Sequence, residues 1–183
     1  LEWKDLFRAK FSLPESPSTE QLHQLTSRSE LVLERVGIQD LAPLQVFVNL
    51  RKLAVFDAPV SSITHISGLR MLTSLKLSRL PVIDFLPISG LAKLEELDIS
   101  NTGIEVLEPI ANLYELKRLN LSGTNLKALK GLETLYALEE LDVASTNLRS
   151  LKPLDGLNNL KKLICFNTRL TTRAVDGFKA VHP

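Results

Sequence analysis

The chain has 183 residues, enough for one domain of ordinary size, and a formal net charge of +1, which gives it no bulk attraction to a polyanion. Although 44% of the residues are hydrophobic, no apolar run approaches the roughly 18 residues that a membrane span needs. A single cysteine permits no internal disulfide and so favours a reducing, cytoplasmic compartment; a cell-surface or secreted location stays open if a leader has been trimmed.

The first 28 residues predict two short helices that precede a repeating pattern. The apolar residues of the first segment share one helical face: Leu1, Trp3, Leu6, Phe7 and Phe11. Ser18 and Gln21 have the spacing of a capping box that opens the second helix. We expect residues 1–28 to cover the open end of the following domain. Trp3 is expected to pack in this cap, with stacking on a ligand as the alternative.

From residue 29 onward, apolar residues recur at a period of 22. One column of the repeat is Leu50, Leu72, Leu94, Leu116, Leu138 and Leu160, and a second is Leu53, Leu75, Leu97, Leu119, Leu141 and Leu163. A fixed period of this size indicates a solenoid. A degenerate copy comes first, so seven rungs begin near residues 28, 50, 72, 94, 116, 138 and 160.

Each rung predicts one short parallel strand followed by an irregular return. Alternation of the Leu97-Asp98-Ile99 type places strands at 52–56, 74–78, 96–100, 118–122, 140–144 and 162–166. Proline recurs at one position of the return: Pro43, Pro87, Pro109 and Pro153. Because proline disrupts a helix interior, we expect 3₁₀ turns or irregular segments there and no long helices.

The repeat ends at about residue 170. Arg173, Asp176 and Lys179 stand where other rungs hold leucine. The segment 172–181 predicts a helix whose inward residues are Ala174, Val175, Phe178 and Val181. We therefore assign 29–170 to the repeats and 171–183 to a C-terminal helical cap, all within one structural domain.

This pattern resembles the leucine-rich-repeat family in its 22-residue class. The segments Glu108-Pro109-Ile110 and Lys152-Pro153-Leu154 are similar to a proline–leucine pair of internalin-type bacterial repeats. The resemblance implies an α/β solenoid, a curved right-handed superhelix with strands on its concave face. The family usually has Asn nine residues into each rung. This chain has other residues there: Val36, Ala58, Leu80, Thr102, Thr124, Thr146 and Thr168.

No pattern in the sequence is typical of catalysis, cofactor binding or metal binding. His23, His65 and His182 are far apart in the repeat, and Cys165 occupies an inward column, where a thiol behaves as a small hydrophobe. Phosphate-binding loops, HExxH zinc motifs and nucleophile elbows do not occur. We therefore expect no enzyme activity, no cofactor and no metal.

Charged pairs at the strand starts alternate in sign: Glu95-Glu96, Lys117-Arg118, Glu139-Glu140 and Lys161-Lys162. Parallel strands lie about 4.8 Å apart, so opposite charges become neighbours. Two interpretations are open: a banded recognition surface, or a ladder of ion pairs that fixes the order of the rungs. The ladder is favoured. Either way the alternating signs cancel, which argues against nucleic-acid binding.

The outward strand positions form the expected concave face and supply the candidate partner-binding residues: Phe56, Lys76, Asp98, Asn120, Asp142, Ile164 and Phe166. The two aspartates are expected to point into water. The two phenylalanines lie near opposite ends of the array. There, anchoring a partner and packing beneath a cap are equally consistent with an aromatic side chain on a strand face.

These observations lead to a non-catalytic module that binds a protein partner on its concave face and rims, as a monomer. A structural or regulatory docking domain of a larger protein is the alternative. A carbohydrate or small-ligand binder is less favoured, because the central concave positions hold serine and alanine rather than aromatic residues.

Overall fold

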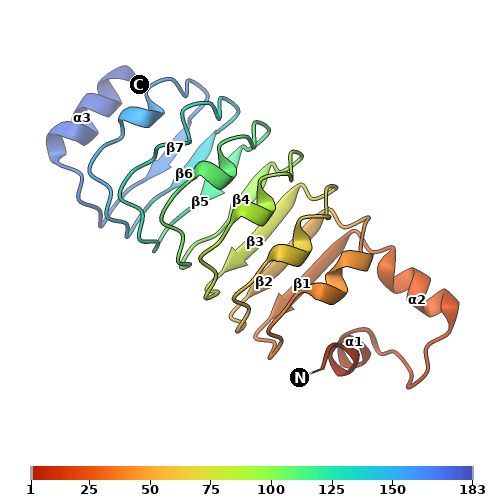
Figure 1. Cartoon of the computed structure of the whole chain (residues 1–183). Coiled ribbons are helices and arrows are strands. Elements are labelled where there is room, and N and C mark those ends of the chain that lie inside the picture. Colours follow the sequence, from red (N-terminus) through yellow and green to blue (C-terminus); the bar gives the residue numbers. More distant parts are fainter. Residues whose placement is uncertain (1, 183) are drawn as a thin grey trace.

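The computed structural model describes residues 2–182; Leu1 and Pro183, which the sequence assigns to the two caps, lie outside this range. Seven parallel strands form one sheet in which strand order follows chain order (Figure 1). Paired residues are offset by 22, as in Leu53 with Leu75. The strands are β1 (Glu30–Glu34), β2 (Lys52–Phe56), β3 (Ser74–Ser78), β4 (Glu96–Asp98), β5 (Arg118–Asn120), β6 (Glu140–Asp142) and β7 (Lys162–Ile164). The predicted solenoid is confirmed.

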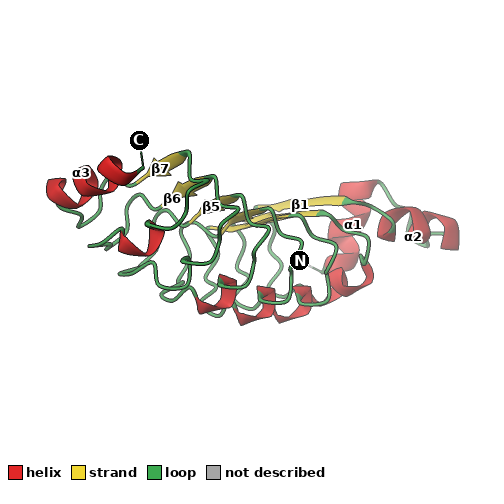
Figure 2. Ribbon diagram, turned by 90° about the horizontal axis from the view of Figure 1, so that it is seen from above, coloured by secondary structure: helices red, strands yellow, loops and turns green. Residues whose placement is uncertain are grey.

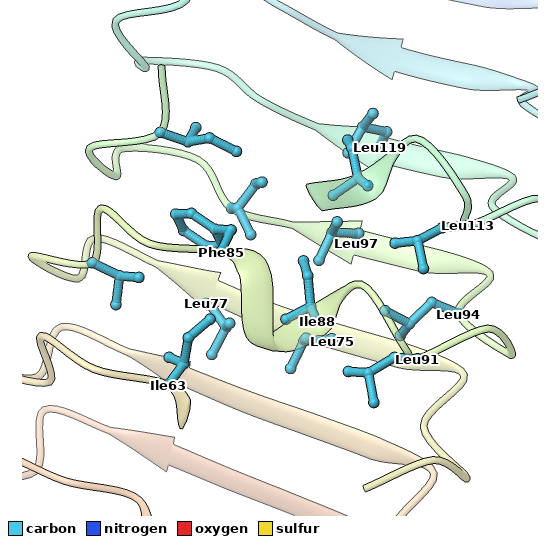
Figure 3. Close-up of a cluster of buried hydrophobic side chains, with 14 of the residues drawn as sticks. Ile63, Leu75, Leu77, Phe85, Ile88, Leu91, Leu94, Leu97, Leu113 and Leu119 are labelled. Atoms are coloured by element: carbon cyan, nitrogen blue, oxygen red, sulfur yellow. The ribbon is translucent and has the colours of Figure 1, made fainter. Parts of the chain in front are cut away.

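The core fills the space between the sheet and the returning segments. Leu75 and Leu97 point into it from neighbouring strands, and Ile88 and Leu91 point into it from one return (Figure 3). These side chains are 2% exposed or less. Complete burial of one leucine or isoleucine contributes about 1.5–3 kcal/mol, so each rung adds its own layer to one continuous core.

The returns carry short 3₁₀ helices on the side opposite the sheet (Figure 2). They are η1 (Ala42–Val46), η2 (Thr64–Ile66), η3 (Leu86–Ile88), η4 (Glu108–Ile110) and η5 (Lys152–Leu154). Proline lies in the first turn of η1, η3, η4 and η5, where its missing N–H costs nothing. The expectation of a convex side without long helices is confirmed for the described residues.

The expected strand bounds hold for β2 and β3, but β4 to β7 end two residues early. In three of these the cause is a side chain in the last strand position. Oδ1 of Asp98, Asn120 and Asp142 accepts a hydrogen bond from the backbone N–H two residues on, at 3.0, 3.0 and 2.9 Å. Such a bond turns the chain out of the extended conformation. Ala54 and Lys76 offer no acceptor at this position, so β2 and β3 continue.

The threonines at the ninth position of the later rungs are buried and satisfied within their own rung. Thr102, Thr124 and Thr146 each donate from Oγ1 to the carbonyl three residues earlier, at 2.7 Å. Thr168 does the same to Cys165 at 3.0 Å. The hydroxyls therefore close a local turn in each rung and do not connect one rung to the next.

Helices α1 (Trp3–Phe11) and α2 (Thr19–Thr26) lie at the β1 end of the solenoid (Figure 1). Leu6 is buried against the first rung, the ring centroid of Phe7 lies 5.6 Å from that of Phe47, and Trp3 Nε1 donates to the Asp40 carbonyl at 3.2 Å. The capping box of Ser18 and Gln21 is present. The inward apolar residues of the first rung, such as Leu31, Leu33 and Leu44, are buried.

Helix α3 (Thr172–Val181) lies beyond β7 and covers its end less completely. Ala174, Val175 and Phe178 are half-buried, whereas Val181 is 64% exposed, so its expected inward position is wrong. His182 takes that place instead, with its ring stacked 4.1 Å from the ring of Phe178. The inward residues of the last rung stay only half-buried: Leu160, Leu163, Cys165 and Leu170.

Candidate protein-binding surface

The outward side chains of the sheet surround a shallow hollow of about 290 Å³ in the second half of the concave face. Five of the candidate residues contribute to its lining: Lys76, Asp98, Asn120, Asp142 and Ile164. Phe56 and Phe166 do not. The structure thus brings most of the expected residues together and places the two aromatic rings outside the hollow.

The aspartates of the hollow are not free in water, contrary to the expectation from the sequence. Asp98 and Asp142 are half-buried because Oδ1 of each holds the turn at the end of its strand. Their Oδ2 atoms make no hydrogen bond within residues 2–182. Each aspartate therefore combines a structural bond on one oxygen with a negative charge that faces the hollow.

The charged pairs at the strand starts form ion pairs between neighbouring rungs. Lys117 contacts Glu95 and Lys161 contacts Glu139, both at 2.8 Å, and Arg118 pairs with Glu96. The hydrogen bond from Lys161 lowers the pKa of Glu139, and the bond to Glu95 raises the pKa of Lys117. These contacts favour the ladder interpretation. Exposed pairs of this kind contribute at most about 1 kcal/mol each.

Phe56 is half-buried next to an ion pair between Asp57 and Arg79. Nε and Nη2 of Arg79 donate to the two carboxylate oxygens of Asp57 at 2.5 and 2.8 Å. The same guanidinium carbon lies 5.8 Å from the centroid of the Phe56 ring. The hydrogen bond from Arg79 holds the pKa of Asp57 below its ordinary value. Phe56 therefore packs against a side chain of the next rung, and a partner would first have to displace it.

Phe166 is in the opposite situation. Its side chain is 68% exposed just after β7, while its carbonyl accepts a hydrogen bond from the Ser145 N–H at 3.0 Å. The backbone is thus fixed in register and presents a large apolar ring to solvent. Ile164, two residues earlier at the end of β7, lines the hollow. Of the two phenylalanines, only Phe166 has the exposure that an anchor requires.

The described residues contain no group of three or more His, Cys, Asp or Glu side chains placed to hold a metal ion. Burial raises the pKa of the half-buried Cys165 thiol, which disfavours its reactive thiolate form. Within residues 2–182, no helix is both long enough and apolar enough to cross a bilayer.

Sequence reasoning overlooked the charged residues of the convex side. Glu105, Lys127 and Arg149 are exposed at the same position of successive rungs. The 22-residue offset between them is the sequence signal that identifies this column.

Sheet, returns and repeat length together define a leucine-rich-repeat solenoid. Residues 16–119, more than half of the chain, match the family described as the leucine-rich-repeat domain of the endo-beta-N-acetylglucosaminidase EndoS. The chain belongs to this family of leucine-rich-repeat domains. Comparison with curated protein sequences finds no match.

Solved structures show the same fold in bacterial proteins. An internalin from Listeria monocytogenes is 23% identical with a TM-score of 0.80, over 91% of this chain and 49% of that one. A leucine-rich-repeat protein from Leptospira interrogans is 22% identical with a TM-score of 0.78, over 88% and 43%. Internalin C2 from Listeria monocytogenes is 19% identical with a TM-score of 0.70, over 92% and 84%. This chain thus spans about half the length of the first two, and the expected likeness to internalin-type repeats is confirmed at the level of the fold.

Proposed function

We propose that this domain binds a protein partner through the second half of its concave face, with Phe166 as the apolar anchor. Leucine-rich-repeat folds generally serve as protein–protein interaction modules, and stacked rungs provide an extended concave platform. The observation that carries the choice of face is the 68% exposure of Phe166 on a backbone held in register. Binding energy at interfaces concentrates on a few such anchors.

The hollow also indicates what the partner carries. The ladder charges are already paired within the domain, so Asp98 and Asp142 supply the available negative charge and Lys76 the positive charge. A complementary partner presents an apolar side chain to Phe166 and Ile164 and a basic side chain to Asp142. Charge complementarity of this kind contributes mainly to specificity and to the association rate.

The experiment compares three variants of the domain in binding to the partner captured with the unmodified protein. Phe166→Ala is expected to weaken binding about 30-fold, in line with about 2 kcal/mol for an anchor residue. Asp142→Asn keeps the turn-forming oxygen and removes only the charge, so it should slow association. Val46→Ala, which shortens an exposed side chain of η1, is the matched control and should leave binding unchanged. Equal affinities of Phe166→Ala and Val46→Ala, with both variants folded, would contradict the proposal.

A second candidate is a docking domain of a larger protein. The family is named for a repeat domain of an enzyme, and the last rung keeps four inward apolar residues only half-buried. An adjoining domain that packed on this end would complete its burial. Hydrogen exchange of residues 160–178 should then be slower in the full-length protein than in the isolated domain. Equal rates would rule this candidate out.

A further inference from the structure

The convex side carries bands of like residues at two repeated positions of the returns, which lie three residues apart in the chain. Rung 3 has Ile83 and Leu86, 76% and 64% exposed. In the following rungs the exposed residues are Glu105 with Glu108, Lys127 with Lys130, and Arg149 with Lys152. The order along the solenoid is therefore an apolar band, an acidic band and two basic bands.

Hydrogen bonds between neighbouring rungs hold these bands side by side. The Gly103 N–H donates to the Val82 carbonyl and the Asn147 N–H to the Leu126 carbonyl, both at 2.9 Å, which joins rungs 3 and 4 and rungs 5 and 6. Rungs 4 and 5 are joined by Oγ1 of Thr134, which donates to the Ala111 carbonyl at 3.1 Å. Glu108 and Lys152 are the first residues of η4 and η5 and repeat the place of Leu86 in η3.

The charges of these bands are not paired with one another. On the concave face, acidic and basic residues of neighbouring rungs contact each other, as Glu95 and Lys117 do at 2.8 Å. Within residues 2–182, none of the six charged residues of the convex bands makes an ion pair within 4.0 Å. The acidic band and the adjacent basic band therefore remain available to an external partner.

Although the sequence led us to expect a monomer, we propose that this convex surface binds a second copy of the chain about a two-fold axis that lies in the interface and runs along the boundary between rungs 4 and 5. Such an axis places the acidic band of each copy on the basic band of the other. Glu105 then faces Lys127 of the second copy, and Glu108 faces Lys130. Each contact occurs twice, as an isologous interface requires.

The residues between and beside the charges fit the same axis. Val106 and Ala128, both exposed, occupy the centre and form an apolar contact across it. Ile83 and Leu86 fall opposite the aliphatic stems of Arg149 and Lys152, respectively, of the second copy. Because the side is convex, contact is limited to rungs 3 to 6. This predicts a weak, salt-sensitive dimer whose concave faces remain free.

Other partners match this surface less well. A strongly acidic partner such as nucleic acid would meet the two basic bands but would be repelled by Glu105 and Glu108 beside them. A strongly basic partner would be attracted to the acidic band but repelled by the two basic bands beside it. Only a surface with adjacent acidic and basic bands matches both, and the chain itself supplies one.

Sedimentation velocity of the full chain over a range of concentrations tests the proposal. The unmodified protein should show a sedimentation coefficient that rises with concentration and falls back at high salt, since the Debye length shortens from about 10 Å at 0.1 M to about 3 Å at 1 M. Two variants reverse one band each: Glu105→Lys with Glu108→Lys, and Lys127→Glu with Lys130→Glu. Each alone should weaken self-association at least tenfold.

Mixing the two variants provides the decisive comparison. In rungs 4 and 5, one variant then carries two basic bands and the other carries two acidic bands, so an equimolar mixture should associate again as a heterodimer. Glu15→Lys with Glu20→Lys, which makes the same change of charge on exposed residues outside the repeats, is the control and should dimerise like the unmodified protein. A protein that stays monomeric at low salt, or a dimer that neither reversal weakens, would overturn the proposal. Failure of the mixture to associate would do so too.

Discussion

Asp98, Asn120 and Asp142 each perform two tasks at one position. Their Oδ1 atoms hold the turn that ends the strand, while the remainder of each side chain lines the concave hollow. A substitution that tests binding at this column must therefore preserve the turn. Asn120 shows that an amide forms the same turn without charge.

For this reason we expect Asp98→Ala and Asp98→Asn to differ in stability. Loss of the acceptor in Asp98→Ala should lower the free energy of unfolding by about 1 kcal/mol, the usual net value of one such hydrogen bond. Asp98→Asn should stay within about 0.5 kcal/mol of the unmodified protein. Urea denaturation followed by circular dichroism measures both. Equal destabilisation by the two substitutions would show that the charge, and not the turn, is what matters.

The carboxylate of Asp57 gives a prediction for pH. Hydrogen bonds from Arg79 hold its pKa in the folded protein below its ordinary value. A depressed pKa contributes stability above the unfolded-state value, about 3.9, and this contribution is lost as pH falls through the folded pKa. Asp57→Asn should therefore flatten the fall in melting temperature below pH 4. Carbon-13 titration of the Asp57 carboxyl provides an independent readout. A titration midpoint at the ordinary value for an aspartate would contradict the hydrogen bonds from Arg79 to Asp57.

The sequence identified the residues of the outward column, but it did not show which of their side chains are covered and which are exposed. Alternation alone places Phe56 and Phe166 on the same face. What distinguishes them is the long side chain of Arg79, which reaches back over Phe56 from the next rung, whereas no rung follows Phe166 within the described repeat. A contact between side chains in different rungs depends on rotamers, which a repeat pattern does not specify.

Among the elements, the two end helices differ in how well they cover the core. Leu6 of α1 is buried and leaves the first rung enclosed, whereas α3 contains no buried residue. In a solenoid, an end that is poorly covered opens more readily than the interior. The N-terminal end is thus expected to be the more stable of the two.

Matched truncations of the two helices test this asymmetry. Leu6→Ala should lower the free energy of unfolding by about 2–3 kcal/mol, because the vacated space lies within the core. Phe178→Ala removes a larger but half-exposed side chain and should cost about 1 kcal/mol. Urea denaturation of both variants measures the difference. A larger loss for Phe178→Ala would mean that α3, and not α1, is the principal cap.

Strand positions were predictable from the sequence because the leucine columns fix the register of every rung. Strand ends were not, although the signal was present: the column that holds Ala54 and Lys76 in the early rungs holds Asp98, Asn120 and Asp142 later, and Asp and Asn favour this turn whereas Ala and Lys do not. The prediction that Val181 points inward from the last helix was wrong, because the ring of His182 stacks on Phe178 in its place.

On the scale of the whole molecule, the solenoid separates two surfaces that face opposite ways. The sheet side carries an internally paired ladder, with the exposed ring of Phe166 just beyond β7, and the convex side carries bands of charge that make no ion pair within residues 2–182. The net charge of +1 conceals this division, since it sums bands of opposite sign. Association through the convex side would leave the concave face of each copy free for a partner.

Site-specific photocrosslinking tests the concave binding surface most directly. Benzoylphenylalanine replaces Phe166 on the concave face in one variant and Val46 on the convex side in another, and both are irradiated with the bound partner. We predict a crosslink from position 166 and none from position 46. A crosslink from position 46 alone would place the partner on the convex side and contradict the proposed concave binding surface.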